Sequence, residues 1–335
     1  MLNTKLLSDT TENIELAAKL IAEGKLVAFP TETVYGLGAD ALNAEAVGKV
    51  YAAKGRPSDN PMIVHIASRE DFVRLTPYIT EDMEKMMDAF WPGPLTMIVP
   101  RKPMIPDTTT GGLDTVGIRM PDHLVALELI AKSGCPIAAP SANLSGKPSP
   151  TVAQHVVDDL DGRVDAIICS NDCQVGIEST VIDMTGERPM ILRPGIITKQ
   201  DVEAVLGKVV LVDPTLNQRP EERGDAEFAP KSPGMKYKHY APNAPMLVFE
   251  GDPDDVRAAI IEEKILREER GEKVVALLFD GTDQRTAAQK FFAQLREADK
   301  ADADVILAAA MPEEGIGFSV MNRMLKSAGY NIKKV

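Results

Sequence analysis

A long stretch without helical or strand periodicity divides this chain into two unequal parts. Residues 213–245 carry prolines at positions 214, 220, 230, 233, 242 and 245 among charged residues. Each proline fixes φ and removes a backbone donor, so regular structure is interrupted repeatedly. Connections this long are uncommon inside compact domains unless they are functional or disordered. The sequence therefore predicts a first domain over residues 1–212, a linker or lid over 213–245, and a smaller second domain over 246–335.

Short apolar runs alternate with amphipathic stretches in the first 212 residues. A helix is expected over residues 11–23, ended by Gly24, and a strand over 26–29, ended by Pro30. Further strands are expected at 62–66, 95–99, 116–120, 137–139, 166–169, 180–183 and 209–212, and further helices at 44–53, 80–90, 122–133, 151–160 and 198–206. Adjacent strands among isolated helices predict an α/β domain with a mixed sheet.

The part beyond residue 245 shows a regular alternation of strands and helices. Strands are expected at 246–249, 274–279 and 304–307, with helices near 253–270, 284–299 and 318–328. This order is typical of a small β-α-β unit with parallel strands. Gly315-Ile-Gly317, before the last helix, lacks the third glycine of a dinucleotide-binding loop, so we interpret it as a helix-packing turn.

Composition narrows the classes of partner that the chain can bind. Apolar residues make up 44% and charged residues 26%, and no apolar run approaches the roughly 20 residues that span a bilayer. The amino terminus lacks a basic segment followed by a long apolar core, so we expect a cytoplasmic location. The net charge of -13 opposes a large basic footprint for nucleic acid. Cys135, Cys169 and Cys173 lack zinc-ligand spacing, so reduced thiols are expected.

The segment Lys54-Gly-Arg-Pro-Ser-Asp-Asn-Pro61 places two cations where Gly and Pro prevent a helix. Apolar residues at 46, 47, 50 and 51 have the spacing of a preceding helix that must stop at Gly55. Lys54 and Arg56 are therefore expected to emerge from the end of a rigid element. The guanidinium fork and the mobile ammonium charge suit a polyphosphate. A solvated loop that only caps the helix is the alternative interpretation.

Two expected strands carry a polar side chain opposite an apolar face. Strand alternation places Arg119 on the face away from positions 116 and 118, together with Thr115 and Gly117. Arg119 can clamp a carboxylate there, or pair with an acidic neighbour. His65 lies opposite positions 62, 64 and 66 and near the cationic loop, so we favour ligand contact over a core histidine.

Polar loops follow several other strands. Residues 140–146 offer hydroxyls, an amide and backbone N–H groups suited to phosphate or ribose, although ordinary turn chemistry explains them equally well. Residues 29–38, 176–181 and 191–195 also place polar groups at strand ends. We find no Ser-His-Asp order, paired-Cys zinc site or Walker phosphate loop. The chemistry would then rest on positioning and charge stabilisation, without a protein-held metal.

Several of these segments match the sequence motifs of one family, in the same order along the chain. They are FPTETVYGLG at 29–38, KGRPSDNP at 54–61, VGIRMP at 116–121, APSANLSG at 139–146, ESTV at 178–181, LRPG at 192–195 and SPGMKYKHYAP at 232–242. On these motifs the chain resembles the long-form threonylcarbamoyl-AMP synthases, and residues 314–329 are similar to the family's closing helix. The resemblance implies a YrdC-like mixed-sheet α/β domain followed by a smaller Rossmann-like α/β domain, with residues 213–245 as the active-site lid.

The resemblance also implies an activity and its residues. L-threonine, bicarbonate and ATP would become threonylcarbamoyl-AMP and pyrophosphate, and a separate transferase complex would modify tRNA without stable nucleic-acid binding by this chain. Mg²⁺ would accompany ATP. Lys54 and Arg56 would be the catalytic cations. Threonine contacts would fall on Thr33, His65, Arg119, Ala139 and Ser179, and ATP contacts on Arg56, Asn60, Thr115, Ser141, Ser149, Arg193 and Tyr237.

Two other functions compete with this interpretation. The hydrogenase-maturation carbamoyltransferases contain a similar domain, but they have paired-Cys zinc modules and a much longer chain. An RNA-binding or ribosome-assembly protein would also use a cationic hollow, but the net charge of -13 argues against it. Threonine-dependent release of pyrophosphate from ATP separates all three possibilities.

Overall fold

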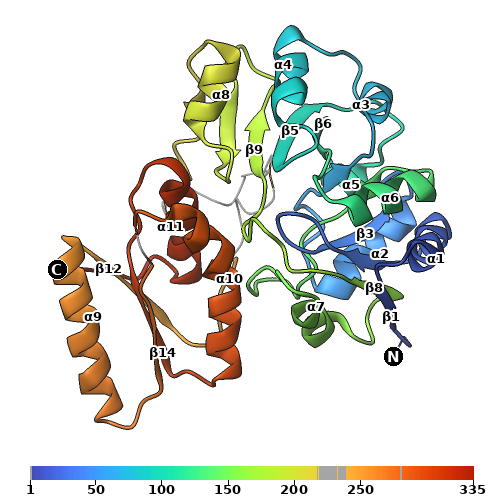
Figure 1. The fold of residues 1–335 in the computed structure, drawn as a ribbon. Helices are drawn as coiled ribbons and strands as arrows, with labels where there is room; N and C mark the ends of the chain where they lie inside the picture. Colours follow the sequence, from blue (N-terminus) through green and yellow to red (C-terminus); the bar gives the residue numbers. More distant parts are fainter. Residues whose placement is uncertain (1, 217, 219–231, 233–238, 280) are drawn as a thin grey trace.

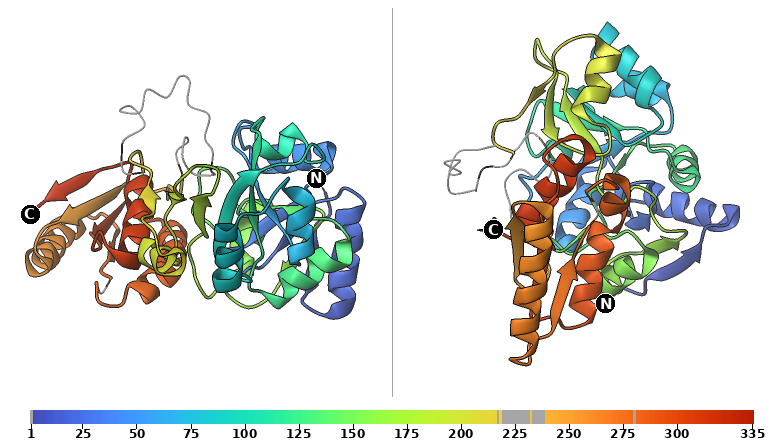
Figure 2. Two further views of the ribbon diagram at one scale, coloured as in Figure 1. Left: turned by 90° about the horizontal axis from the view of Figure 1, so that it is seen from above. Right: turned by 60° about the vertical axis from the view of Figure 1, so that its left-hand side comes forward.

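The computed structural model describes residues 2–216, 218, 232, 239–279 and 281–335. These residues contain an 11-stranded sheet and a 4-stranded sheet, each with its own helices (Figure 1). Figure 2 shows the two α/β bodies side by side, with the strands and helices after residue 245 forming the smaller one. The expected fold class, a mixed-sheet α/β domain followed by a smaller α/β domain, is confirmed.

The large sheet is mixed, with the strand order β1-β8-β2-β3-β7-β4-β6-β5-β9-β10-β11. For example, β4 pairs parallel with β6 and antiparallel with β7. The strands of this sheet are β1 Lys5–Ser8, β2 Val27–Phe29, β3 Gly36–Asp40, β4 Ile63–His65, β5 Leu95–Pro100, β6 Thr115–Arg119, β7 Ile137–Ala138, β8 Ala166–Cys169, β9 Thr180–Asp183, β10 Met190–Arg193 and β11 Leu211–Val212. Sequence patterns missed β1, β3 and β10.

Helices before residue 212 form where local signals start and stop them. They are α1 Thr11–Ala22, α2 Ala44–Lys54, α3 Arg69–Leu75, α4 Glu81–Phe90, α5 Asp107–Thr110, α6 Leu124–Ser133, α7 Ala153–Leu160 and α8 Lys199–Leu206. In α2, the Asn43 side chain accepts from the amides of Glu45 and Ala46 at 3.1 Å each, and Gly55 caps the other end at φ 63°. The expected stop at Gly55 is thus confirmed, whereas α3 and α5 were not expected.

The small sheet is parallel throughout, with the strand order β13-β14-β12-β15. Its strands are β12 Met246–Glu250, β13 Val274–Leu277, β14 Val305–Ala309 and β15 Ile332–Lys334, and its helices are α9 Pro253–Glu268, α10 Gln284–Lys300 and α11 Gly315–Ser327. The segment from Gly315 to Gly317 is the first turn of α11 and does not precede the helix as expected. A Cβ on Gly317 would lie 2.3 Å from the Pro312 carbonyl oxygen, so this glycine permits close packing.

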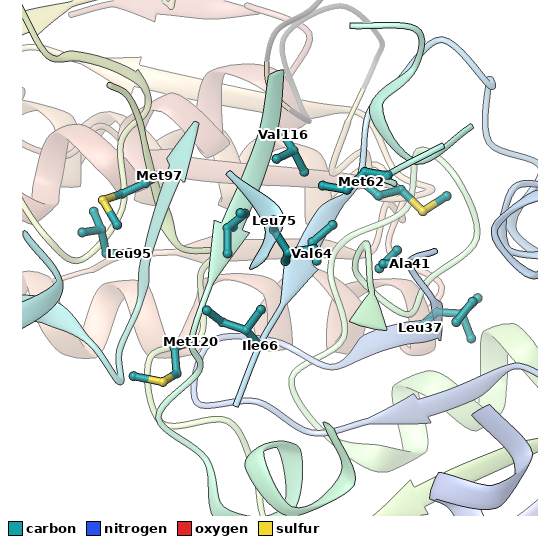
Figure 3. Close-up of a cluster of buried hydrophobic side chains, with 14 of the residues drawn as sticks. Leu37, Ala41, Met62, Val64, Ile66, Leu75, Leu95, Met97, Val116 and Met120 are labelled. Carbon is teal, nitrogen blue, oxygen red and sulfur yellow. The ribbon is translucent and has the colours of Figure 1, made fainter. Parts of the chain in front are cut away.

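The main hydrophobic core lies against one face of the large sheet. Figure 3 shows Val64, Ile66 and Val116 from neighbouring strands pointing into one cluster with Met62 and Leu75. The side chains of β4 and β6 that alternate with these point to the opposite face. This alternation sends His65 and Arg119 to the same side of the sheet, as the sequence predicts.

Helices α10 and α11 face the large sheet across the boundary between the two bodies (Figure 1). Gly176 lies at this boundary with φ 79°, and a Cβ there would be 2.4 Å from both Cα and O of Gln289 in α10. Only glycine allows both this backbone conformation and this approach. The two bodies are therefore docked backbone against backbone at this point.

Replacing Gly176 by alanine should weaken this docking, because the methyl group would meet the Gln289 backbone. We expect a loss of about 2 kcal/mol in the free energy of unfolding, measured by urea titration. Gly207→Ala is the matched control, since Gly207 has φ 65° and open space around its Cβ position. That change should cost about 1 kcal/mol. Equal losses in both variants would contradict a close approach at Gly176.

Candidate active site

A cavity of about 60 Å³ lies at the ends of several strands of the large sheet. It is lined by Thr31, Thr33, Val34, Tyr35, Gly36, Arg56, Ile63, His65, Arg119, Ala139, Pro140, Ser141, Glu178, Ser179, Arg193, His239 and Tyr240. The strand-end loops expected to carry polar groups therefore converge. Of the predicted site residues, the cavity brings together Thr33, Arg56, His65, Arg119, Ala139, Ser141, Ser179 and Arg193.

Arg119, at the end of β6, is held from two sides. Its Nη2 lies 2.6 Å from Glu32 Oε2, and its Nη1 donates to Thr33 Oγ1 at 2.9 Å. Both charged side chains are almost completely buried, at 4% and 9% exposure. The sequence left open whether Arg119 binds a ligand or pairs with an acidic neighbour. The structure shows that it pairs with Glu32 and also lines the cavity. Sequence reasoning missed Glu32, although it lies within the motif at residues 29–38.

Arg193 and Ser179 form a second hydrogen-bonded group. Arg193 donates from Nε to the Ser179 carbonyl oxygen and from Nη2 to Ser179 Oγ, both at 3.0 Å. The Ser179 hydroxyl also lies 2.8 Å from Thr96 Oγ1. Burial lowers the pKa of Arg193, and the nearby charge of Glu178 opposes that shift. Ser179 is therefore fixed by side chains from two strands of the large sheet, β5 and β10.

Arg56 enters the cavity from the loop after α2. Its Nη2 donates to the carbonyl oxygens of Asn60 and Pro61, at 3.3 and 3.0 Å. Burial, with the charge of Arg193, lowers its pKa to about 10, so it remains a cation at neutral pH. Among the described residues, Arg56 forms no ion pair, and its buried Nε has no hydrogen-bond partner. Its positive charge is thus available to an anion in the cavity.

Lys54 lies elsewhere than expected. Its side chain does not emerge from the helix end but is buried, and Nζ donates to the carbonyl oxygens of Ser141 and Asn143. Burial and the charge of Arg56 hold its pKa well below the usual value. In this structure Lys54 therefore fixes the loop at 141–143 and is not part of the cavity lining.

Three further predicted contacts lie outside the cavity lining. Asn60 is buried, and its carbonyl oxygen accepts from Tyr51 at 3.0 Å. Thr115 is half-buried at the start of β6, and the buried Ser149 donates to Glu178 Oε1 at 2.5 Å. Tyr237 and most of residues 213–245 lie outside the described residues.

His239 and Tyr240 line the cavity, but sequence reasoning did not select them. Burial raises the pKa of Tyr240 to about 12, and burial together with Arg56 holds the pKa of His239 well below its ordinary value. The Ala241 amide donates to the Gly146 carbonyl oxygen at 2.8 Å, which ties this segment to the loop after β7. Both residues belong to the motif at 232–242, so the signal was present in the sequence.

Two protein-family models match this chain in sequence. A family model described as "Telomere recombination" matches residues 19–195, and one described as "Threonylcarbamoyl-AMP synthase, C-terminal domain" matches residues 197–329. A threonylcarbamoyl-AMP synthase of Pyrococcus abyssi is 47% identical over 332 residues, which cover 96% of each chain. One of Bacillus subtilis is 46% identical over 336 residues, covering 96% of this chain and 95% of the relative.

A solved structure supports the same assignment. The crystal structure of P. abyssi Sua5 complexed with L-threonine matches with a TM-score of 0.91 at 45% identity, covering 99% of each chain. The fold and the site thus define an α/β enzyme that uses ATP. The chain belongs to the threonylcarbamoyl-AMP synthase family, in its two-domain form.

The described residues include neither a cluster of metal-binding side chains nor a membrane-spanning helix. No group of three or more His, Cys, Asp or Glu side chains in that part of the chain could hold a metal ion. None of the helices that the structure describes is long and apolar enough to cross a membrane.

The buried His65 should make the folded state sensitive to acid. Burial, with the charge of Arg119, lowers its pKa to about 3, whereas an unfolded histidine titrates near 6.5. The stability that this depressed pKa contributes is present above about pH 6.5 and is lost as the pH falls toward about 3. Between about pH 7 and about pH 5 the loss is about 2 kcal/mol.

His65→Gln should therefore reduce the loss of unfolding free energy over this pH interval by about that amount. Urea titrations of both proteins at the two pH values measure the difference. Identical losses in the two proteins would show that His65 takes up no proton on unfolding.

Proposed function

We propose that this chain joins L-threonine, bicarbonate and ATP into threonylcarbamoyl-AMP, releasing pyrophosphate and water, for the threonylcarbamoyladenosine modification of tRNA. The observation that carries the proposal is the convergence of Arg56, Arg119 and Arg193 with hydroxyl groups at one cavity. Guanidinium groups bind carboxylates and phosphates through paired donors. The full-length relatives named threonylcarbamoyl-AMP synthase support the same activity.

The proposed reaction has two steps. The amine of threonine first captures carbon dioxide or bicarbonate as a carbamate. A carbamate oxygen then attacks the α-phosphorus of ATP, and the bond to the β-phosphate breaks to release pyrophosphate. No covalent enzyme intermediate is needed, so the protein contributes positioning and stabilisation of negative charge.

We place threonine against Thr33, His65, Arg119, Ala139 and Ser179. Arg119 would bind the substrate carboxylate, because Glu32 and Thr33 hold its guanidinium group at the cavity wall. The lowered pKa of His65 keeps its imidazole neutral, so it would act as a hydrogen-bonding partner and not as a charge. Ser179 would contribute its hydroxyl from a position fixed by Arg193.

We place ATP against Arg56, Asn60, Thr115, Ser141, Ser149, Arg193 and Tyr237, with Lys54 as a second cation behind the loop at 141–143. His239 and Tyr240 are the lining residues that belong to the segment at 213–245.

Mg²⁺ would enter the site with the phosphates of ATP. The cavity itself offers guanidinium groups, hydroxyls and the carboxylate of Glu178, which is paired with Arg323. Because Mg²⁺ prefers free carboxylates, phosphates and water as ligands, this donor set fits an ion carried by the nucleotide. Mg²⁺ would neutralise charge on the β- and γ-phosphates as pyrophosphate leaves.

We further propose a cytoplasmic protein that hands its product to a separate threonylcarbamoyl transferase complex and does not bind nucleic acid stably. The net charge of -13 supports this division of labour, because tight tRNA binding needs many exposed cations. We also propose the domain limits 1–212 and 246–335, with residues 213–245 as a lid over the nucleotide. The contact of Ala241 with Gly146 supports a lid that reaches the catalytic loops.

The lid proposal predicts a ligand-dependent change in proteolysis. Closure over the nucleotide would exclude water and protease from the segment at 213–245. Cleavage in that segment should slow by about 10-fold when ATP and threonine are both bound, measured by limited proteolysis with mass spectrometry. The same rate with and without ligands would leave the segment as a tether.

The proposed sites predict different losses for two arginine substitutions. Arg56→Ala should slow adenylate formation by about 100-fold at saturating ATP, because a cation at the phosphates is lost. Arg119→Ala should raise KM for threonine by about 10-fold or more, with a smaller effect on ATP. Both are measured by threonine-dependent pyrophosphate release in steady-state titrations.

Arg56→Lys is the matched variant for the first substitution. It keeps the charge but loses the fork, so it should recover only part of the rate. Near-normal turnover of Arg56→Ala would exclude Arg56 from the phosphates. Equal losses for both substrates in Arg119→Ala would contradict the division into two sites.

A further inference from the structure

A buried ion pair connects the smaller body to the cavity. Arg323 of α11 is fully buried, and its Nε lies 3.2 Å from Glu178 Oε2. Its Nη1 donates to the Pro194 carbonyl oxygen, and to that of Ser319 at 3.2 Å. Arg323 therefore reaches across the boundary and binds two strand-end loops of the large sheet.

Glu178 is the junction between this arginine and the cavity. Its Oε1 accepts from Ser149 at 2.5 Å. Glu178 itself lines the cavity. Burial alone would raise its pKa, but the charges of Arg323 and Arg193 together with its hydrogen bonds outweigh burial, and the pKa lies below its ordinary value. The carboxylate is therefore ionised at neutral pH and accepts from the Ser149 hydroxyl.

Ser179, the next residue, is anchored independently of Arg323. Its hydroxyl and carbonyl groups bind Arg193, and its hydroxyl also contacts Thr96. Loss of Arg323 would thus disturb Glu178 and the Ser149 hydroxyl bound to it more than it disturbs Ser179. Ser149 is among the residues that we place at the nucleotide, and Ser179 is among those that we place at threonine.

Stability alone does not account for a fully buried arginine at this place. Removing two charges from water is costly, and apolar side chains of similar volume often stabilise a protein as well or better. A buried ion pair does impose one orientation on its partner, because the fixed donors of the guanidinium group define where the carboxylate oxygens lie. The hydrogen bond of the Ser149 hydroxyl to Glu178 depends on this orientation.

We propose that Arg323 is a positioning residue for the nucleotide half of the active site, acting through Glu178 on Ser149. The inference rests on the function proposed above. The smaller body is then part of the active site, because it supplies the cation behind one cavity wall. Without Arg323, Glu178 would lose its ion-pair partner and reorient toward Arg193, and the Ser149 hydroxyl would lose its acceptor.

The test compares Arg323→Met with the parent chain in threonine-dependent pyrophosphate release. We expect KM for ATP to rise by about 10-fold or more, the effect of losing a charge-assisted hydrogen bond, while KM for threonine changes by less than about 2-fold. A purely structural role would lower the active fraction without separating the two constants. Equal changes in both, or no change, would overturn the proposal.

Ser319→Ala is the matched control. Ser319 lies one turn from Arg323 on the same helix, is buried, and donates across the boundary to the Gly195 carbonyl oxygen at 2.7 Å, but it does not contact Glu178. This variant should leave both KM values unchanged. If it reproduces the rise in KM for ATP, docking of the smaller body explains the effect and the role of Arg323 is refuted.

Two further variants keep the test decisive. Arg323→Lys keeps the charge but loses the two-pronged guanidinium geometry, so its KM for ATP should lie between the values of the parent and of Arg323→Met. This variant decides the question if Arg323→Met does not fold. Arg323→Met should raise KM for ATP less when it is introduced into Glu178→Gln than when it is introduced into the parent, because both changes act through one carboxylate. Full additivity would contradict this path.

A parent chain that releases no pyrophosphate in response to threonine would refute the proposed function. If the parent is active but the Arg323 variants have an unchanged KM for ATP, only the positioning role is refuted.

Discussion

The site depends on burying several guanidinium groups around one cavity without losing the fold. Arg56, Arg119 and Arg193 line the cavity, and cations this close repel one another in a medium of low polarity. Glu32 and Glu178 offset this repulsion, each at a position where it also orients an arginine. Arg56 and Arg193 form no ion pair with a carboxylate among the described residues, since backbone carbonyl groups hold Arg56 and Ser179 holds Arg193. This leaves net positive charge for an anionic ligand.

Both buried carboxylates bridge segments that are distant in the sequence. Glu32 follows β2 and meets Arg119 from β6, whereas Glu178 precedes β9 and meets Arg323 from α11 of the smaller body. A second arginine crosses the same boundary: Arg296 of α10 donates to the Pro148 carbonyl oxygen at 2.6 Å and to Asp159 at 2.9 Å. Asp159 in turn accepts from the Leu144 amide at 3.1 Å. The loop at 144–149 is thus fixed from the smaller body as well.

Local signals predicted most of the helices and strands but not these pairs. Helix α2 could be predicted because its apolar spacing, its cap at Asn43 and its stop at Gly55 all lie within the element. Strand β3 was missed because glycine disfavours strands, yet a Cβ on Gly38 would lie 2.8 Å from Phe29 and Ile137. Arg323 shows the same limit, since an amphipathic helix pattern places a charged residue in solvent and only tertiary packing buries it. The motifs contain most cavity residues, because the loops that carry them meet at one edge of the large sheet.

An acidic chain and a cationic cavity are compatible because they act over different distances. The net charge of -13 belongs mainly to exposed side chains, whose field is screened over about 8 Å in physiological salt. The buried arginines act in a poorly screened environment at hydrogen-bond distance, where a small anion can meet several of them together. The same chain can therefore be acidic overall and still present positive charge to a small anion at the cavity.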